Sequence, residues 1–597
     1  MTYAAPLKDM QFVLNELAGL NEVQALPNCE EATPELVEAV LQEHAKFCSE
    51  VIAPLNAPAD KNPGGLVNGE VQTAQGFKDA FQAFVEGGWQ GLRHPEIFGG
   101  QHLPKIVATP CMEMLNAANL SFALCPLLTD GAIEALMLAG SEQQKSTYLN
   151  KLVAGEWTGT MNLTEPQAGS DLSLIRTRAE PQADGTHKIF GTKIFITYGE
   201  HDLAENIVHL VLARTPDAPQ GVKGISLFVV PKFLVNADGS LGARNDVHCV
   251  SLEHKLGIKA SPTAVLQFGD EGGAVGTLVG EKNRGLETMF IMMNAARFAV
   301  GVQGVAVAER AYQQAVGYAK ERVQSRDPAS ESDEPLTIIH QPDVRRMLLS
   351  MRAQIEAARA LAYVGAAASD IAQHHPDEAE RRKQQAFYEY LVPIIKGWST
   401  EMAIDVASTG IQVHGGMGYI EETGAAQHYR DARILAIYEG TTAIQANDLL
   451  ARKTARDGGK VARAMLAEMQ SIERQFAAAE HTDLQAIAKG LAPALQAYEA
   501  AVDFIVKTLP SDPHAAYAAG VPYLKLAGIV LGGWQMARAA LIAHERLQQG
   551  GNDESFLKAK IITARFFADH FLPQAGALCT AILQGSAYMM ALDENQF

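Results

Sequence analysis

The spacing of hydrophobic residues divides the chain into a helical block, a strand-rich block and a long helical remainder. Thr33 and Pro34 have the residue types of an N-cap and a first helical position, and apolar residues follow them at helical spacing. Beyond about Gly155 the pattern alternates instead. Apolar, β-branched segments bounded by Gly, Pro or Asp predict antiparallel strands at 207–213, 225–230 and 265–268.

Helical periodicity returns near Gly285, is strong over 344–361 and continues past Trp398. The polar stretch 326–335 (RDPASESDEP) interrupts this block, so it predicts an exposed loop between two helices.

The chain beyond about Thr454 is dominated by Ala, Leu, Gln and Glu, and it predicts a further, all-helical unit. Its most apolar stretch, 521–543, is interrupted by Lys525, Gln535 and Arg538, which would be costly at the centre of a bilayer. We therefore expect a buried helix there and no membrane span.

Composition narrows the class of protein. Hydrophobic residues make up 47% of the chain and charged residues 20%, as in ordinary globular proteins. The net charge of -19 argues against nucleic acid or anionic lipid as a partner, because both require clustered Lys and Arg. The six cysteines form no CxxC pair and the amino terminus lacks the features of a signal peptide, so we expect no metal site and a cytoplasmic location.

Familiar nucleotide and metalloprotease motifs are absent from the sequence: no GxGxxG follows a strand, and neither GxxxxGK[ST] nor HExxH occurs. The chemistry is carried by other segments. The turn LTEPQAGSD at 163–171 has small residues that could bring backbone amides and hydroxyls close to a cofactor. A purely structural loop is the alternative.

Three further segments have the residue types of a ligand site. Phe195-Ile196-Thr197 could present an aromatic ring and a hydroxyl to a planar ligand, although core packing would also explain the phenylalanine. The glycines of QVHGGMG at 412–418 allow close backbone approach, or simply end a helix. Glu439 lies between Tyr438 and Gly440 before another helix, as a candidate base or as a plain residue of the helix amino terminus.

Seven strings in this order resemble the acyl-CoA dehydrogenase family: LTEPQAGSDL, KIFIT, EHKLGIKASPT, GEKNRGLETM, NAARF, QVHGGMGY and RDARILAIYEGTTAIQ. The resemblance spans about residues 34–453. The tail beyond it resembles an extended subgroup that includes 3-methylmercaptopropionyl-CoA dehydrogenases and some bacterial fatty acyl-CoA dehydrogenases.

The resemblance implies an α+β fold of four domains after a short arm. The expected parts are an arm at 1–33, an amino-terminal helical domain at 34–158, a central β-barrel-like domain at 159–282, a four-helix bundle with the catalytic glutamate at 283–453, and an additional carboxy-terminal helical domain at 454–597.

The resemblance also implies a mechanism. FAD would lie between the strand domain and the bundle, with the reacting acyl carbons between the flavin and Glu439. Glu439 would remove the α-proton while its own backbone amide and a flavin hydroxyl hydrogen-bond the thioester oxygen, and hydride would leave for flavin N5. A related subgroup carries its base at the position of Ala296, so Glu439 has no evident rival.

The site residues implied by the resemblance fall into three sets. Expected FAD contacts within one chain are Leu163, Thr164, Ser170, Phe195, Ile196, Thr197 and Thr441. Expected contacts to the FAD of a neighbouring subunit are Arg322, Gln324, Gln412 and Gly416. Expected substrate contacts are Ser170, Asn294, Arg297, Tyr438 and Gly440, although a salt bridge would equally explain Arg297. The sequence departs from the family at Phe195, Asn294 and Ala443, where tryptophan, aspartate and an amide residue are common.

The expected reaction is the α,β-desaturation of a fatty acyl-CoA or similar thioester to trans-2-enoyl-CoA, with electron-transfer flavoprotein as electron acceptor and a homodimer as the assembly. The alternatives are an acyl-CoA oxidase that uses oxygen, a 3-methylmercaptopropionyl-CoA dehydrogenase, and a non-catalytic flavoprotein that serves as a binding module. The carboxy-terminal unit is expected to replace contacts that a second dimer supplies in shorter relatives. Membrane attachment of this tail is the alternative, but the tail lacks the basic face of an interfacial helix.

Overall fold

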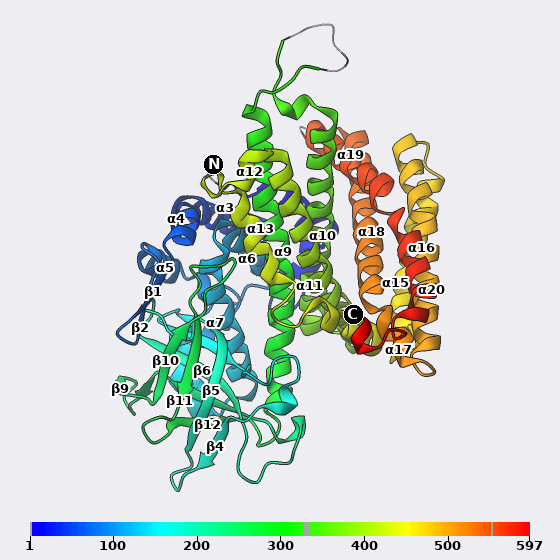
Figure 1. Cartoon of the computed structure of the whole chain (residues 1–597). Helices are drawn as coiled ribbons and strands as arrows, with labels where there is room; N and C mark the ends of the chain where they lie inside the picture. Colours follow the sequence, from blue (N-terminus) through cyan, green and yellow to red (C-terminus); the bar gives the residue numbers. More distant parts are fainter. Residues whose placement is uncertain (1–2, 328, 330–333, 551–552) are drawn as a thin grey trace.

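The computed structural model describes residues 3–327, 329, 334–550 and 553–597. Its first part is helical, as the apolar spacing predicts (Figure 1). The side chain of Thr33 accepts a hydrogen bond from the Leu36 amide at 3.3 Å, which confirms the predicted N-cap. The elements are α1 (Leu7–Phe12), α2 (Leu20–Gln24), α3 (Pro34–Phe47), α4 (Asn56–Lys61), β1 (Gly64–Val67), β2 (Glu70–Thr73), α5 (Phe77–Glu86), α6 (Lys105–Ala118), α7 (Leu120–Ala139) and α8 (Glu142–Val153).

The second part is a sheet of eight strands in the order β10-β11-β5-β12-β7-β6-β3, with β4 paired to β5. The predicted strand segments lie mainly in β6, β7 and β11. All pairs are antiparallel except β3 with β6, which is parallel. The strands are β3 (Trp157–Asn162), β4 (Arg178–Pro181), β5 (His187–Thr197), β6 (Asn206–Ala213), β7 (Ser226–Pro231), β10 (Val247–Leu252), β11 (Thr263–Phe268) and β12 (Ala274–Val279), with a separate hairpin of β8 (Phe233–Val235) and β9 (Leu241–Arg244).

The third part is a bundle of α9 (Gly285–Glu321), α10 (Pro342–His374), α11 (Glu378–His414) and α13 (Ala425–Leu435), followed by α14 (Thr442–Asn447). Gly301 and Gly304 let α9 approach α11 closely, because a Cβ at these positions would lie 2.5 Å from the Ile395 side chain and 2.6 Å from the Ser399 carbonyl. The predicted loop 326–335 lies partly outside the described residues, and those described in it connect α9 to α10 and are mostly exposed.

The fourth part consists of α15 (Lys460–Ala477), α16 (Thr482–Thr508), α17 (Pro513–Ala518), α18 (Gly520–Gln549), α19 (Glu554–His570) and α20 (Gln574–Gln584). It packs along the bundle on the side away from the sheet (Figure 1). The Trp398 ring of α11 lies against Gly528 and Gly532 of α18, where a larger residue would not fit. The expected order of domains and the α+β class are therefore confirmed.

Three described helices are long and apolar enough to cross a membrane: α7, α9 and α18. Within their most apolar windows, 67%, 76% and 83% of the residues are buried inside the fold. The apolar character of α18 therefore serves its packing against α10, α11 and α19.

Candidate active site

Glu439 lies in the turn between α13 and α14. Its φ is +54°, and that of the following Gly440 is +87°, so two consecutive residues have the left-handed conformation. The side chain of Thr441 then caps α14 by accepting a hydrogen bond from the Ile444 amide at 3.4 Å. Because Glu439 precedes this cap by two residues, it is not a first-turn residue of the helix.

Two buried side chains hold the backbone of this turn. Lys396 of α11 donates a hydrogen bond from Nζ to the Gly440 carbonyl at 2.7 Å. Gln445 of α14 donates from Nε2 to the carbonyls of Glu439 and Gly440, both at 3.2 Å. Lys396 and Gln445 have no exposed surface, so the turn rests on a dry, polar support.

Glu439 is partly buried, and burial raises the pKa of its carboxyl above the ordinary value. The positive charges of Arg297 and Lys396 oppose that rise. Burial also lowers the pKa of Lys396, to about 8, although the nearby negative charge of Glu439 counteracts the decrease. A partly buried carboxylate with a raised pKa near two cations is a suitable base.

Tyr438 is anchored by a chain of hydrogen bonds. Its hydroxyl donates to Oε1 of Gln303 in α9, and Nε2 of Gln303 donates to Oδ1 of Asn116 in α6 at 3.1 Å. Gln303 and Asn116 are buried. The aromatic ring beside Glu439 is therefore fixed by both the bundle and the amino-terminal domain.

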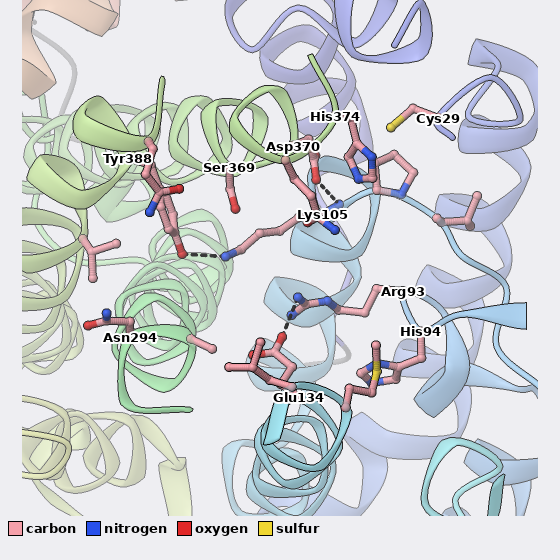
Figure 2. A pocket seen from close by; sticks show the side chains of 18 of the residues that line it. Cys29, Arg93, His94, Lys105, Glu134, Asn294, Ser369, Asp370, His374 and Tyr388 are labelled. Atoms are coloured by element: carbon pink, nitrogen blue, oxygen red, sulfur yellow. Dashed lines mark hydrogen bonds and ion pairs between the residues drawn. The ribbon is translucent and has the colours of Figure 1, made fainter. Parts of the chain in front are cut away.

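Asn294 and Arg297 lie one turn apart on α9 but in different surroundings. Arg297 is buried, 3.7 Å from Asp448, and its Nε has no hydrogen-bond partner in the described structure. The salt bridge to Asp448 therefore explains the Arg297 Nη1 group but leaves the buried Nε without a partner in the described structure. Asn294 is exposed and lines a polar cleft of about 630 Å³, shown in Figure 2.

This cleft lies between the amino-terminal domain and the bundle, and the sequence analysis did not identify it. Two of its cations have partners within the lining: Arg93 pairs with Glu134 at 2.5 Å, and Lys105 donates a hydrogen bond to the Tyr388 hydroxyl at 2.6 Å (Figure 2). Asn294 belongs to its lining, whereas Glu439 and Phe195 do not. Its residues are far apart in the sequence, so no local motif could have indicated it.

Phe195 lies in a β-bulge near the end of β5. Lys193 pairs with Leu266 and Ile196 with Ala264, so two residues of β5 stand opposite Val265 alone. Phe195 has a φ of +60° and is 58% exposed, which rules out core packing as its role. Ile196 is buried in the sheet core, and Thr197 is half-buried.

The 163–171 turn is fastened to the same strand. Lys193 forms a buried 2.8 Å ion pair with Glu165 and donates to the Leu163 carbonyl at 3.0 Å, while the Ile194 amide donates to the Thr164 carbonyl at 3.0 Å. Burial raises the pKa of Glu165, but Lys193 and hydrogen bonds outweigh it and bring the pKa down to about 2. Burial lowers the pKa of Lys193 to about 8. The ion pair thus holds Leu163 and Thr164 against β5.

The four residues expected to contact a neighbouring subunit's cofactor lie elsewhere. Arg322, Gln324, Gln412 and Gly416 are exposed at the ends of α9 and α11, the end of the bundle remote from the sheet (Figure 1). The rings of Tyr318 and His414 stack with centroids 4.4 Å apart and hold these two helix ends together.

The face around Phe195 suits a flat, ring-shaped cofactor. An exposed aromatic ring beside a half-buried threonine hydroxyl, on a rigid strand, offers one apolar surface and one polar edge. The adjoining 163–171 turn adds backbone groups fixed by its ion pair. These features fit the isoalloxazine of FAD.

Four family models match the chain in sequence. The amino-terminal, middle and carboxy-terminal domains of acyl-CoA dehydrogenase match residues 34–156, 160–270 and 283–454, and the acetyl-CoA dehydrogenase C-terminal-like model matches residues 465–593.

Named relatives cover nearly the whole chain. It is 54% identical to 3-methylmercaptopropionyl-CoA dehydrogenase of Ruegeria pomeroyi, over 97% of each chain. It is 34% identical to butyryl-CoA dehydrogenase of Syntrophomonas wolfei, over 100% of this chain and 99% of the relative.

Two solved structures share the fold. Acyl-CoA dehydrogenase of Bacillus anthracis, complexed with FAD, has a TM-score of 0.75 at 21% identity and covers 96% of this chain and 92% of its own. ACDH-11 of Caenorhabditis elegans, in complex with C11-CoA, has a TM-score of 0.77 at 19% identity and covers 98% and 96%. The chain therefore belongs to the acyl-CoA dehydrogenase family and is an oxidoreductase with FAD as its cofactor.

Proposed function

We propose that Glu439 is the base that removes the α-proton of an acyl-CoA thioester, so that the chain forms a trans-2-enoyl-CoA. The observation that carries this proposal is a partly buried glutamate in a left-handed turn, whose carboxyl has a raised pKa and lies near the charges of Arg297 and Lys396. When bound, FAD supplies the acceptor for the hydride that leaves the β-carbon. The residues proposed to hold it are Leu163, Thr164, Ser170, Phe195, Ile196, Thr197 and Thr441, with Arg322, Gln324, Gln412 and Gly416 of a second copy.

The protein's own part is to take one proton and to stabilise the charge that remains. As the proton moves to Glu439, negative charge develops on the thioester oxygen, and we assign the Glu439 backbone amide as a donor to it. Tyr438 and Gly440 flank the reacting carbons, while Asn294 and Arg297 act on the substrate side of α9. The partly buried position of Glu439 limits the solvation of its carboxylate, which makes it a stronger base.

For the substrate, we propose a short linear acyl-CoA and favour 3-methylmercaptopropionyl-CoA. The 54% identity to the Ruegeria pomeroyi enzyme of that name supports this choice, and the butyryl-CoA dehydrogenase of Syntrophomonas wolfei supports a short chain. A panel of thioesters mixed with the oxidised enzyme without oxygen would rank them by the rate of flavin bleaching. Faster bleaching by a long-chain acyl-CoA would contradict the proposal.

We further propose that the enzyme is a cytoplasmic homodimer that passes its electrons to an electron-transfer flavoprotein. The six cysteines are free and buried, which suits a reducing compartment. The proposed FAD residues on the sheet lie far from those at the ends of α9 and α11, at the opposite end of the molecule (Figure 1). This separation supports a cofactor site that a second copy of the chain completes. Hydrogen peroxide formed as fast as a dye is reduced would instead make oxygen the acceptor.

The test of the base is Glu439→Gln, which keeps the shape of the side chain and removes its basicity. We expect this variant to retain FAD and to lose at least about a thousandfold in the rate of bleaching by acyl-CoA. Flavin absorbance per protein and an anaerobic stopped-flow measurement give the two values. Undiminished bleaching would falsify the role of Glu439.

A further inference from the structure

Lys396 contacts the backbone of the turn that carries Glu439, although it stands 43 residues before Glu439 in the sequence. It is fully buried in α11, and its Nζ lies 2.7 Å from the Gly440 carbonyl oxygen. A lysine is rarely buried without a charged or polar partner. Its position therefore requires an explanation.

We propose that Lys396 is a positioning residue for Glu439: its ammonium fixes the Gly440 carbonyl and supplies a positive charge that favours the ionised carboxylate. This inference rests on the proposed role of Glu439 as the base. Lys396 itself touches neither substrate nor cofactor in this proposal.

The hydrogen bonds explain how Lys396 controls geometry. A left-handed turn at a non-glycine residue is strained and persists only when its surroundings hold it. The Gly440 carbonyl oxygen accepts hydrogen bonds from Lys396 of α11 and Gln445 of α14, so side chains of two helices hold it. Without Lys396, the Gly440 carbonyl would keep, among the described hydrogen bonds, only that from Gln445 of the following helix.

The charges around Lys396 explain its second effect. The groups that face it are Glu439 in the turn, Arg297 on α9 and Glu401 on α11. Glu401 already accepts a hydrogen bond from the Thr442 hydroxyl at 2.5 Å, and Arg297 has Asp448 as its partner. Within the described residues, Lys396 makes no side-chain ion pair at bonding distance. Its charge is thus available to the Glu439 carboxylate.

The sign of this effect is definite. A nearby cation favours the carboxylate, and both Lys396 and Arg297 lower the pKa of Glu439 against the effect of burial. Removing the cation should raise the pKa of Glu439, so the base becomes ionised only at higher pH. The acid limb of the activity profile should move in the same direction.

The experiment compares Lys396→Met, Lys396→Gln and Lys396→Arg by anaerobic flavin bleaching against pH, with rates expressed per bound FAD. We expect Lys396→Met to lose about tenfold to a hundredfold in rate, as a misplaced catalytic group does, and to move the acid limb to higher pH. Lys396→Gln should move the limb similarly, because the charge is lost. Lys396→Arg should restore the wild-type limb, because it keeps the charge.

Lys560→Met is the matched control. Lys560 of α19 is a second buried lysine, but it pairs with Asp9 of α1 and Glu356 of α10. Its loss should lower the Tm and leave the acid limb unchanged. If the Lys396 variants show the same pattern, with a lower Tm and an unmoved limb, the positioning role is overturned. Failure of the base itself is recognised separately, because Glu439→Gln would then still bleach.

Discussion

At the scale of single residues, the turn that carries the proposed base Glu439 contains a glycine in a conformation that other residues rarely adopt. Gly440 has a φ of +87°, and a Cβ there would lie 2.8 Å from Nε2 of Gln445, the group that holds the turn. An alanine would therefore add left-handed strain, about 1–2 kcal/mol, and displace a supporting hydrogen bond. Both effects act on the residue that follows Glu439.

We predict that Gly440→Ala retains FAD but loses at least about tenfold in the bleaching rate, because a small displacement of a catalytic base strongly lowers the reaction rate. Stopped-flow bleaching and flavin absorbance would measure the two effects. Gly576→Ala is the control, since a Cβ at this helical position meets nothing within 4 Å. Equal rates for the two variants would show that the turn tolerates a side chain.

The same scale shows what could be predicted from the sequence. Glu439 stands in a recognisable string, so its place in a turn before a helix was predictable. Lys396 was not, because only the packing of α11 against the turn brings it to Gly440. The sequence left two roles for Phe195, core packing or ligand contact. Only the β-bulge, which exposes the ring, decides against core packing.

At the scale of elements, the proposed FAD-binding surface around Phe195 depends on how the 163–171 turn is fastened to β5. The Lys193 and Glu165 side chains are buried, and breaking such a pair from one side leaves a buried charge without compensation. Glu165 also accepts hydrogen bonds from the amides of Arg176 and Thr177, so the pair organises a longer segment.

We predict that Lys193→Met lowers the free energy of unfolding by about 3–5 kcal/mol and releases FAD. Urea unfolding and the ratio of flavin to protein absorbance test both effects. The control is Lys188→Met on the same strand, whose side chain is only partly buried and should be replaceable without loss of FAD. Full FAD content in Lys193→Met would mean that the turn is held without the pair.

Elements differ in how well local pattern specifies them. The start of α3 was predictable because its cap is encoded within four residues. The parallel pairing of β3 with β6 was not, because it joins strands more than forty residues apart and depends on the whole sheet. The expectation of antiparallel strands is therefore correct for every sheet pair except this one.

At the scale of the whole molecule, a buried charge cluster joins parts that the sequence presents as separate. Arg359 of α10 contacts Asp9 at 2.6 Å, Glu113 at 2.6 Å and Glu309 at 2.9 Å, and Lys560 of α19 also contacts Asp9. The amino-terminal arm, the bundle and the carboxy-terminal helices thus share one polar core. Sequence pattern assigns such residues to the surface, so this cluster could not be predicted.

The arrangement of the FAD residues makes an assembly prediction possible. Met417, Tyr419 and Ile420 are 46%, 85% and 41% exposed beside Gly416, at the end of the bundle that holds the residues proposed to contact a second subunit's FAD. In a dimer these apolar side chains would be covered, and each subunit would complete the other's cofactor site. Loss of the interface should therefore also weaken FAD binding.

We predict that the wild type is a dimer by light scattering and that Tyr419→Asp yields monomers with reduced FAD content, because a buried, unpaired carboxylate opposes association. Tyr588→Asp is the control: Tyr588 is 83% exposed in the carboxy-terminal segment and is not one of the proposed FAD residues, so its variant should remain dimeric and retain FAD. A Tyr419→Asp monomer with full FAD would show that one chain holds the cofactor alone. A wild-type tetramer would show that the carboxy-terminal helices do not replace a second dimer.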